Sequence, residues 1–457
     1  MSAQSREFSK NEALSDTIGA VRKKGLPLIA GLFIVSLVVP LFINLGSVRL
    51  PIYRIVLLAL FVPGLYRLFS GQVGRVRLPD LCVVAICLWS SISFVVNHGL
   101  GPMVETIGLV WIDTLGAYLI GRCYIRTPEA FHATVRLLFW LAVILLPFAI
   151  YEAMSGEAII IKLFSEIGAT YPDHWMEKRM NLDRVQGPFP HPIHFGVFIL
   201  SLVGVSYYVL GYNQAWVNRI AKAFIIALTG AFCLSSGPLV SLMAQANIIV
   251  WDGLMKSFRQ RWHFLLGLSV LGFIIVDLIS NRTPFHVLAS YLSFNAQTAY
   301  SRINIWIWGT KNIFDNPLFG IGFNDWERLY FMTDSVDMFW ILPAMQNGIP
   351  VWILWFLLFF SIFLSVAYRR NLNEKSNWYR TGYLVTMFGM FMVGWTVHFW
   401  THTYVFFVFM LASGIWFCDH EERSESPEQR AKPSNVNTLL YSRFEPKKAR
   451  ILDRRDG

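Results

Sequence analysis

Apolar residues in this chain are gathered into long runs that are separated by short polar connections. A run of about 18 to 20 apolar residues can cross the hydrocarbon of a bilayer as a helix, because a helix satisfies its backbone polar groups within the segment. The pattern therefore predicts an all-α integral membrane protein with about twelve transmembrane helices. The expected spans are residues 28–45, 52–69, 79–97, 104–121, 135–153, 192–211, 219–235, 238–255, 263–280, 349–368, 380–397 and 400–417.

Two connections, residues 154–191 and 281–348, are much longer than the others. Both are rich in aromatic and branched apolar residues, which disordered segments lack, so we expect folded loops that carry short helices along the membrane interface. The membrane domain is expected over residues 28–417. A polar N-terminal segment at 1–27 precedes it, and a charged, disordered tail at 418–457 follows it.

Composition and charge add an orientation to this pattern. Apolar residues make up 55% of the chain and charged residues only 15%, which excludes a soluble protein of this size. Roughly eighteen Lys and Arg residues collect in the connections on one side, against about two, Arg49 and Arg54, on the other. Basic residues stay on the cytoplasmic side, so both termini are predicted to be cytoplasmic and both long connections to face outward.

The same reasoning limits the partners and the redox chemistry. The net charge of +10 is explained by orientation signals and anionic lipid, so no nucleic-acid partner is needed. All five cysteines lie in predicted spans or at predicted cytoplasmic ends, so we expect no disulfide. No cluster of Cys and His has the spacing of a metal site.

The first long connection ends in RVQGPFPHPIHFG, residues 184–196. Its three prolines hold the backbone extended until a helix begins after Pro192. Arg184 is thereby held at a defined place above the membrane. One interpretation is an arginine that reaches lipid phosphate, and the other is a guanidinium that binds a substrate phosphate through paired hydrogen bonds.

The second long connection contains YSRINIWIWGTKNIFDNPLFGIG, residues 300–322. It opens with Arg302 and continues with apolar residues at helical spacing, including Trp306, which indicates a helix along the interface. Asn316 and Pro317 are expected to end this helix, and the two glycines that follow are expected to turn the backbone sharply. Asp337 follows, before the apolar helix that begins near residue 349.

Taken together, three features carry a family resemblance. They are Arg184-x-x-Gly187 with prolines before a helix, Arg302 and Trp306 followed by NPLFGIG, and Asp337 eleven positions ahead of the Gly-Ile that opens a long apolar helix. In this order and on one membrane side, they resemble the O-antigen ligase and O-antigen polymerase family of bacterial envelope proteins.

That resemblance implies a membrane glycosyltransferase of the bacterial cytoplasmic (inner) membrane, with its active site in the periplasmic loop region. Such an enzyme takes a glycan from an undecaprenyl-pyrophosphate carrier and joins it to an acceptor hydroxyl with inversion, without a metal or another cofactor. Arg184 and Arg302 match the arginines that hold the donor pyrophosphate. The sequence departs from the pattern at Asp337, where ligases have histidine followed by asparagine, and at Gly237, where relatives often have arginine.

The chemistry of the residues fits this role. Breaking a glycosyl-pyrophosphate bond places negative charge on the leaving oxygen, and without a metal that charge is met by fixed cations such as Arg184 and Arg302. Asp337 can accept the proton of the acceptor hydroxyl if partial burial raises its pKa, or alternatively cap a helix. The further residues predicted to contact substrate are Arg179, Arg282, His191, His194 and Trp306.

Other functions remain open at this point. A flippase for a lipid-linked glycan or another transporter would concentrate polar groups at the membrane midplane. Asp113 lies within an expected span and could mark an ion path, but a partner on a neighbouring helix also explains it. A non-catalytic subunit of a polysaccharide assembly is a third alternative. Within the enzyme interpretation, the missing histidine-asparagine pair favours a polymerase of exopolysaccharide or O-antigen repeats over a ligase that modifies the lipopolysaccharide core.

Overall fold

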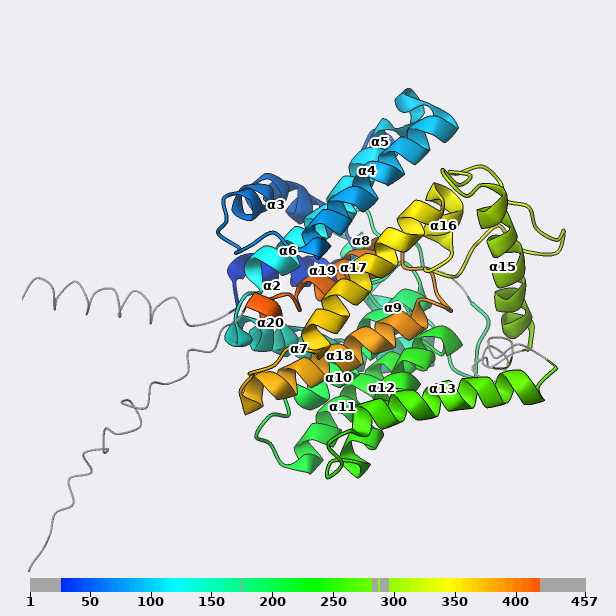
Figure 1. The fold of residues 1–457 in the computed structure, drawn as a ribbon. Coiled ribbons are helices and arrows are strands. Elements are labelled where there is room, and N and C mark those ends of the chain that lie inside the picture. The colour runs from blue at the N-terminus through cyan, green and yellow to red at the C-terminus, as the bar shows by residue number, and fades with distance from the viewer. Residues whose placement is uncertain (1–25, 174–175, 282–286, 288–295, 420–457) are drawn as a thin grey trace, which may run out of the picture. The chain divides into compact units, whose positions relative to one another are not determined.

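The structure is a computed structural model that describes residues 26–173, 176–281, 287 and 296–419 (Figure 1). The chain divides into two units, Met1–His420 and Glu421–Gly457, and all described residues belong to the first. The described part is mostly helical, as predicted. Seven of its helical segments are long and apolar enough to cross a membrane. They are Ile52–Phe69, Leu78–His98, Leu100–Tyr124, Pro128–Ser155, Arg261–Ile279, Ile349–Ala367 and Thr401–Asp419.

Several expected spans appear as shorter or broken helices. The run at 192–211, for example, consists of two short helices. In chain order the described helices are α2 (Leu28–Ser36), α3 (Ile52–Phe69), α4 (Leu78–His98), α5 (Leu100–Val110), the π-helix η1 (Trp111–Gly116), α6 (Ala117–Tyr124), α7 (Pro128–Ser155), α8 (Ile159–Ser165), α9 (Pro192–Leu200), α10 (Val203–Tyr208), α11 (Trp216–Ala231), α12 (Ser236–Leu254), α13 (Arg261–Ile279), α15 (Ala296–Asp315), α16 (Leu342–Asn347), α17 (Ile349–Ala367), α18 (Glu374–Val393), α19 (Thr401–Ala412) and α20 (Trp416–Asp419).

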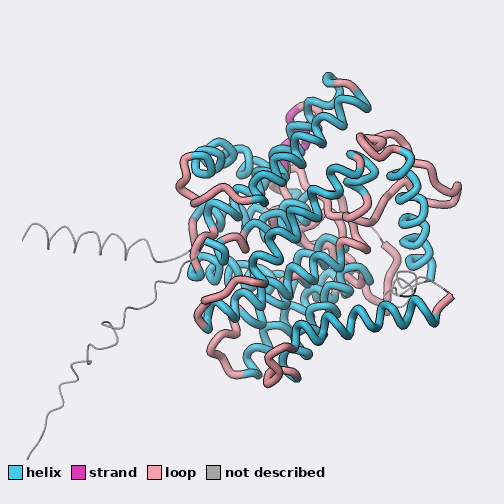
Figure 2. Tube along the Cα trace, in the orientation of Figure 1, coloured by secondary structure: helices cyan, strands magenta, loops and turns pink. Residues whose placement is uncertain are grey.

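The first apolar run is not the single helix expected over 28–45. Helix α2 ends at Ser36, and the strands β1 (Phe42–Leu45) and β2 (Val48–Pro51) form an antiparallel hairpin, drawn in magenta in Figure 2. Pro40 cannot donate a helical hydrogen bond, and Gly46 takes a left-handed φ of 62° in the turn between the strands. The run is apolar enough for a span, but its backbone is bent by these two residues.

Close approaches between helices hold the bundle together. Helix α4 packs along α17, and α6 packs along α19 (Figure 1). At Gly121 of α6, an added Cβ would lie 2.5 Å from the carbonyl oxygen of Phe409, so the two backbones touch there. Small residues at such crossings are typical of helix packing in membranes.

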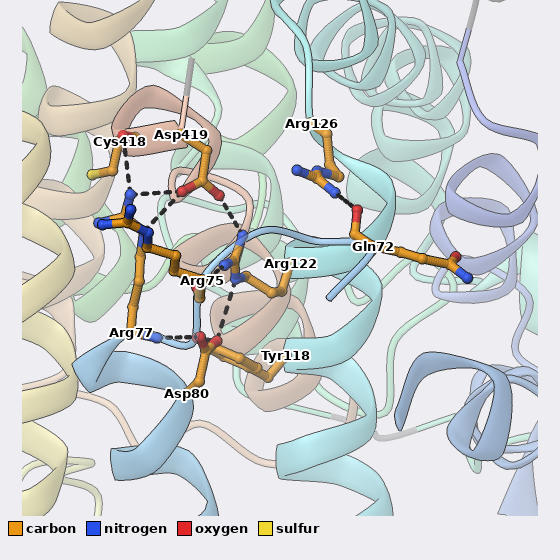
Figure 3. A network of polar contacts seen from close by, with 9 residues as sticks. All are labelled: Gln72, Arg75, Arg77, Asp80, Tyr118, Arg122, Arg126, Cys418 and Asp419. Carbon is orange, nitrogen blue, oxygen red and sulfur yellow. Dashed lines mark hydrogen bonds and ion pairs between the residues drawn. The ribbon is translucent and has the colours of Figure 1, made fainter. Parts of the chain in front are cut away.

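A network of charged side chains lies at the N-terminal end of α4 (Figure 3). Asp80 accepts hydrogen bonds from the Tyr118 hydroxyl (2.6 Å) and from Arg122 Nε (3.2 Å). Asp419 accepts from Arg77 Nε (2.8 Å) and from Arg122 Nη1 (2.6 Å). Arg122 and Asp80 are each 2% exposed, so this is a buried network in which both signs of charge are paired.

The C-terminal end of α4 holds the NPLFGIG turn. The Trp89 indole N–H donates to the carbonyl oxygens of Leu318 and Asn347 (both 3.2 Å), and Ser93 Oγ donates to that of Phe319 (2.5 Å). On its other side, the turn donates from Ile321 N to the carbonyl oxygen of Met345 in α16 (2.8 Å). Side chains of a candidate transmembrane helix thus satisfy the backbone of this irregular segment.

Asp113, within a candidate span, has a partner on a neighbouring helix. Arg54 of α3 donates to it from Nη2 (2.6 Å) and Nε (2.9 Å). The explanation by a neighbouring helix therefore holds for this residue.

Candidate functional site

The segment that carries Arg184 is fixed by a buried carboxylate. Glu152, near the end of α7, is 3% exposed and accepts hydrogen bonds from the backbone N–H groups of Gln186 (2.7 Å) and Gly187 (3.2 Å). Gly187 has a left-handed φ of 54°, and an added Cβ would lie 3.0 Å from the Phe195 ring. Arg184 therefore precedes a turn whose backbone has little freedom.

Arg179 and Arg184 both contact the connection before α12. Arg179 Nη1 donates to the carbonyl oxygen of Leu234 (2.7 Å), and Arg184 Nε lies 3.5 Å from that of Cys233. The pKa of Arg184 is lowered, first by burial and then by the nearby charge of Arg179. Two guanidinium groups are thus held close together, and an anion between them would relieve their electrostatic repulsion.

Arg302 reaches the same place from α15. Its side chain is 6% exposed, and its Nη2 donates to Ser236 Oγ (3.3 Å) at the first position of α12. Burial lowers the pKa of Arg302 to about 10, and Asp337 opposes that shift, so the group stays charged at neutral pH. The structure therefore brings Arg179, Arg184 and Arg302 together on residues 233–236.

Helix α12 adds its own positive end to this cluster, which we call the arginine cluster (Arg179, Arg184 and Arg302). Its N-cap, Ser235, makes no side-chain capping bond, and the first backbone N–H groups of a helix carry partial positive charge. Gly237 lies in the first turn, and an added Cβ there would lie 2.4 Å from Val397 Cγ2. The backbone at this position has no room for an arginine in the packing that this chain adopts.

Asp337 lies next to this cluster but does not cap a helix. Helix α16 begins at Leu342 with Ile341 as its N-cap, so the capping interpretation is wrong. The side chain is exposed between buried Val336 and Met338, and it accepts a hydrogen bond from Ser335 Oγ (2.6 Å). Its charge acts on Arg302, which places a carboxylate beside the arginine cluster.

The predicted helix after Tyr300 is confirmed, and so is its end. Helix α15 ends at Asp315, and Gly320 and Gly322 have left-handed φ values of 61° and 62°. Trp306 lies on α15 and contacts the Trp395 ring, with 6.0 Å between centroids. Arg282 lies outside the described residues.

His191 and His194 belong to a second cluster, around Trp400. His191 caps α9, because its Nδ1 accepts the backbone N–H of Ile193 (3.1 Å). The His194 ring meets the Trp400 ring edge-on, with 4.5 Å between centroids, and the other imidazoles near it are those of His191, His398 and His402. The predicted histidines thus gather with two others that sequence reasoning missed.

His398, Trp400 and His402 were missed because they lie at the junction of two predicted apolar spans. The signal in the sequence is HFWTH, residues 398–402, which places two histidines and a tryptophan in an otherwise apolar region. Thr401, in the same stretch, has a left-handed φ of 47°, which is costly for a β-branched residue. Burial lowers the pKa of His398 to about 4, so this imidazole is neutral at neutral pH.

Comparison with known proteins does not identify the chain: no protein-family model and no curated protein sequence matches it. Within the described residues, no group of three or more His, Cys, Asp and Glu side chains is arranged to hold a metal ion. The arginine cluster with Asp337 beside it is therefore the candidate functional site on its own geometry.

Proposed function

We propose that this protein transfers a glycan from an undecaprenyl-pyrophosphate carrier to an acceptor hydroxyl at the periplasmic face of a bacterial inner membrane. The favoured reaction is the polymerisation of exopolysaccharide or O-antigen repeat units. An O-antigen ligase that uses the lipid A-core as acceptor is the alternative within the same chemistry. The partners are then the lipid-linked donor, a glycan or lipid-linked acceptor, membrane lipid and other polysaccharide-assembly proteins.

One observation carries the proposal: the convergence of Arg179, Arg184 and Arg302 on residues 233–236 at the start of α12. They come from two connections that are far apart in the sequence. Guanidinium groups bind phosphoryl oxygens through paired hydrogen bonds, and a helix N-terminus favours the same ligand. A diphosphate carries enough charge to engage more than one of them.

The reaction needs few further parts. The acceptor oxygen attacks the anomeric carbon, the bond from that carbon to the phosphate oxygen breaks, and its electron pair leaves with the diphosphate, which the arginine cluster stabilises. Asp337 takes the proton of the attacking hydroxyl, because a carboxylate beside the cluster is a suitable general base. Inversion follows from a single displacement.

Helix α4 supports the proposal that the candidate site lies at the periplasmic face of the membrane. This helix has 21 residues and is therefore about 31 Å long, close to the thickness of the hydrocarbon. The charged network with Arg122 lies at its start, and the NPLFGIG turn, which follows the Arg302 helix, lies at its end. An excess of basic residues at the first end favours the cytoplasm there, and thus the periplasm for the second.

Binding of a diphosphate lipid tests the donor site. Purified protein in detergent is titrated with undecaprenyl diphosphate, with undecaprenol as the uncharged comparison. Arg184→Ala and Arg302→Ala are each expected to weaken binding about tenfold or more, because each removes a charge-assisted hydrogen bond. Arg259→Ala, an exposed arginine after α12, is the control and should bind as the unmodified protein does.

Product formation in cells tests the reaction. Asp337→Asn is expected to keep diphosphate binding but to abolish polymer at normal protein abundance. Normal polymer formation by Arg184→Ala, Arg302→Ala and Asp337→Asn alike would rule out this site. Movement of the carrier headgroup across a vesicle membrane without glycan transfer would instead identify the flippase alternative.

A further inference from the structure

A cavity of about 400 Å³ lies beside the candidate site. Its walls come from the turn after α15 (Gly322–Trp326), from residues 334–336, from α16 and from the connection that leads into α19. Its volume is within the range of small-ligand sites, about 300 to 1,000 Å³. Ser335, one of its lining residues, donates to Asp337, so the cavity adjoins the proposed general base.

The lining combines aromatic faces with hydrogen-bonding groups. Phe323, Trp326 and Trp400 supply the aromatic surface. Amide, hydroxyl and carboxylate groups lie between them, and these are the side chains of Asn324, Asp325, Asp334, Ser335 and Gln346. A sugar ring needs this combination, because its C–H faces pack on aromatic rings while its hydroxyl groups donate to side-chain oxygens.

Several of these groups are fixed in place. The Phe323 ring stacks on Phe94 of α4, with 4.9 Å between centroids, and the Phe323 N–H donates to His98 Nε2 (2.8 Å). The Trp326 indole N–H donates to the carbonyl oxygen of Asp334 (3.1 Å). Walls that are ordered before a ligand arrives lower the entropic cost of binding.

The charge of the cavity is negative. Asp325 and Asp334 both line it, and both are held by the guanidinium of Arg328, which does not line it. Arg328 lowers the pKa of Asp325 through this hydrogen bond, so that carboxylate stays ionised. An anionic ligand would be repelled here.

His398 also lines the cavity, and its ring adds to the wall beside Trp400. Its Nδ1 is buried from solvent, so that atom does not face the cavity.

We propose that this cavity binds the sugar ring that carries the acceptor hydroxyl, and that it selects a neutral or amino sugar against a uronic acid. The proposal rests on the proposed function, because it takes the occupant to be the acceptor of that reaction. Trp400 and Trp326 hold the ring faces, Asn324 and Gln346 offer hydrogen bonds to the hydroxyl groups, and the two carboxylates set the charge preference. The ring then lies next to Ser335 and Asp337.

Saturation-transfer NMR on the full-length protein in detergent tests this site directly. The probes are the methyl glycosides of glucose, galactose, mannose and N-acetylglucosamine, together with the methyl glycosides of glucuronic and galacturonic acid. At least one neutral sugar should receive saturation, at about five times the level of its uronic counterpart. Trp400→Ala should reduce that signal about fivefold, whereas Trp140→Ala, an exposed tryptophan of α7, should leave it unchanged.

Asp334→Asn separates the charge claim from stability. The Asp334 side chain is 87% exposed, so this change keeps shape and fold while it removes a charge. Asp334→Asn should reduce the difference in saturation-transfer signal between the glycosides of glucose and glucuronic acid. An equal signal from both sugars in the unmodified protein, no signal from any neutral sugar, or an undiminished signal in Trp400→Ala would each overturn the proposal.

The donor experiment is independent of this one. If the unmodified protein binds the sugar but not undecaprenyl diphosphate, the proposed function is wrong. Diphosphate binding without sugar binding would defeat only the cavity assignment.

Discussion

A single buried carboxylate decides where Arg184 lies. Glu152 accepts the backbone N–H groups of Gln186 and Gly187, and each of these groups would otherwise be buried without a partner. We expect Glu152→Gln to lower the free energy of unfolding by about 1 to 3 kcal/mol, because the NH₂ group that replaces Oε2 would face the Gly187 N–H as a second donor. Thermal unfolding in detergent measures this, and diphosphate binding should weaken with it.

The matched control for this change is Glu157→Gln. Glu157 is an exposed residue just past the end of α7, and its partner Lys162 is exposed as well. It should leave both stability and binding nearly unchanged. Equal effects of the two substitutions would contradict a positioning role for Glu152.

The pair of Asp80 and Arg122 makes a second prediction at the scale of residues. Arg122 keeps Asp419 as a partner when Asp80 is changed, so Asp80→Asn removes one buried charge-assisted interaction and is expected to cost about 1 to 3 kcal/mol. Glu327→Gln, which breaks the exposed pair with Lys311, should cost less than about 1 kcal/mol.

A double-mutant cycle on this network distinguishes pairing from general disruption. Asp80→Asn combined with Arg122→Gln should be more stable than the sum of the two single changes predicts, because both changes remove the same interaction. Strict additivity in chemical unfolding would show that the two side chains do not act as a pair.

At the scale of elements, the sequence predicts the helices whose apolar runs are long and uninterrupted. Helices α3, α4 and α17 begin and end within about one residue of the expected spans 52–69, 79–97 and 349–368. The end of α15 at Asp315 was also predicted, because Asn316 and Pro317 are strong local signals. The hairpin at 42–51 was missed, because β1 is held by a distant loop: Phe42 N donates to the carbonyl oxygen of Ala169.

Helix contacts add a testable consequence at Gly121. An added Cβ there would lie 2.5 Å from a backbone oxygen of α19, which cannot move aside like a side chain. Gly121→Ala is therefore expected to destabilise the protein by about 1 to 3 kcal/mol in thermal unfolding. Gly108→Ala in α5, where an added Cβ meets nothing within 4 Å, should be neutral or stabilising by up to about 1 kcal/mol.

At the scale of the whole molecule, the sequence singled out the residues of the arginine cluster but not their common target. Arg184 and Arg302 were recognisable because one precedes three prolines that hold the backbone extended and the other opens an amphipathic helix. That both reach residues 233–236 depends on how two distant connections fold over α12, which no local pattern encodes. The same holds for His398 and His402, whose neighbours come from α9 and the first long connection.

Membrane orientation gives a prediction at this scale. The four other native cysteines are buried, so only Cys418 is replaced by serine. A cysteine introduced at Glu177 or at Ser301, both exposed, should then react with a membrane-impermeant maleimide in intact cells. A cysteine at Gln72, exposed and next to the charged network, should react only after the membrane is permeabilised. Reaction of position 177 or 301 only after permeabilisation would place the arginine cluster in the cytoplasm and remove the basis for a periplasmic reaction.

The NPLFGIG turn has a consequence for motion. Its carbonyl oxygens accept hydrogen bonds from Trp89 and Ser93 on one side, and the N–H groups of Ile321 and Gly322 donate to α16 on the other. Hydrogen exchange across residues 317–322 should then occur as a single cooperative event, shared with the end of α4. A ligand that enters the neighbouring cavity therefore meets a wall that should open only as a whole.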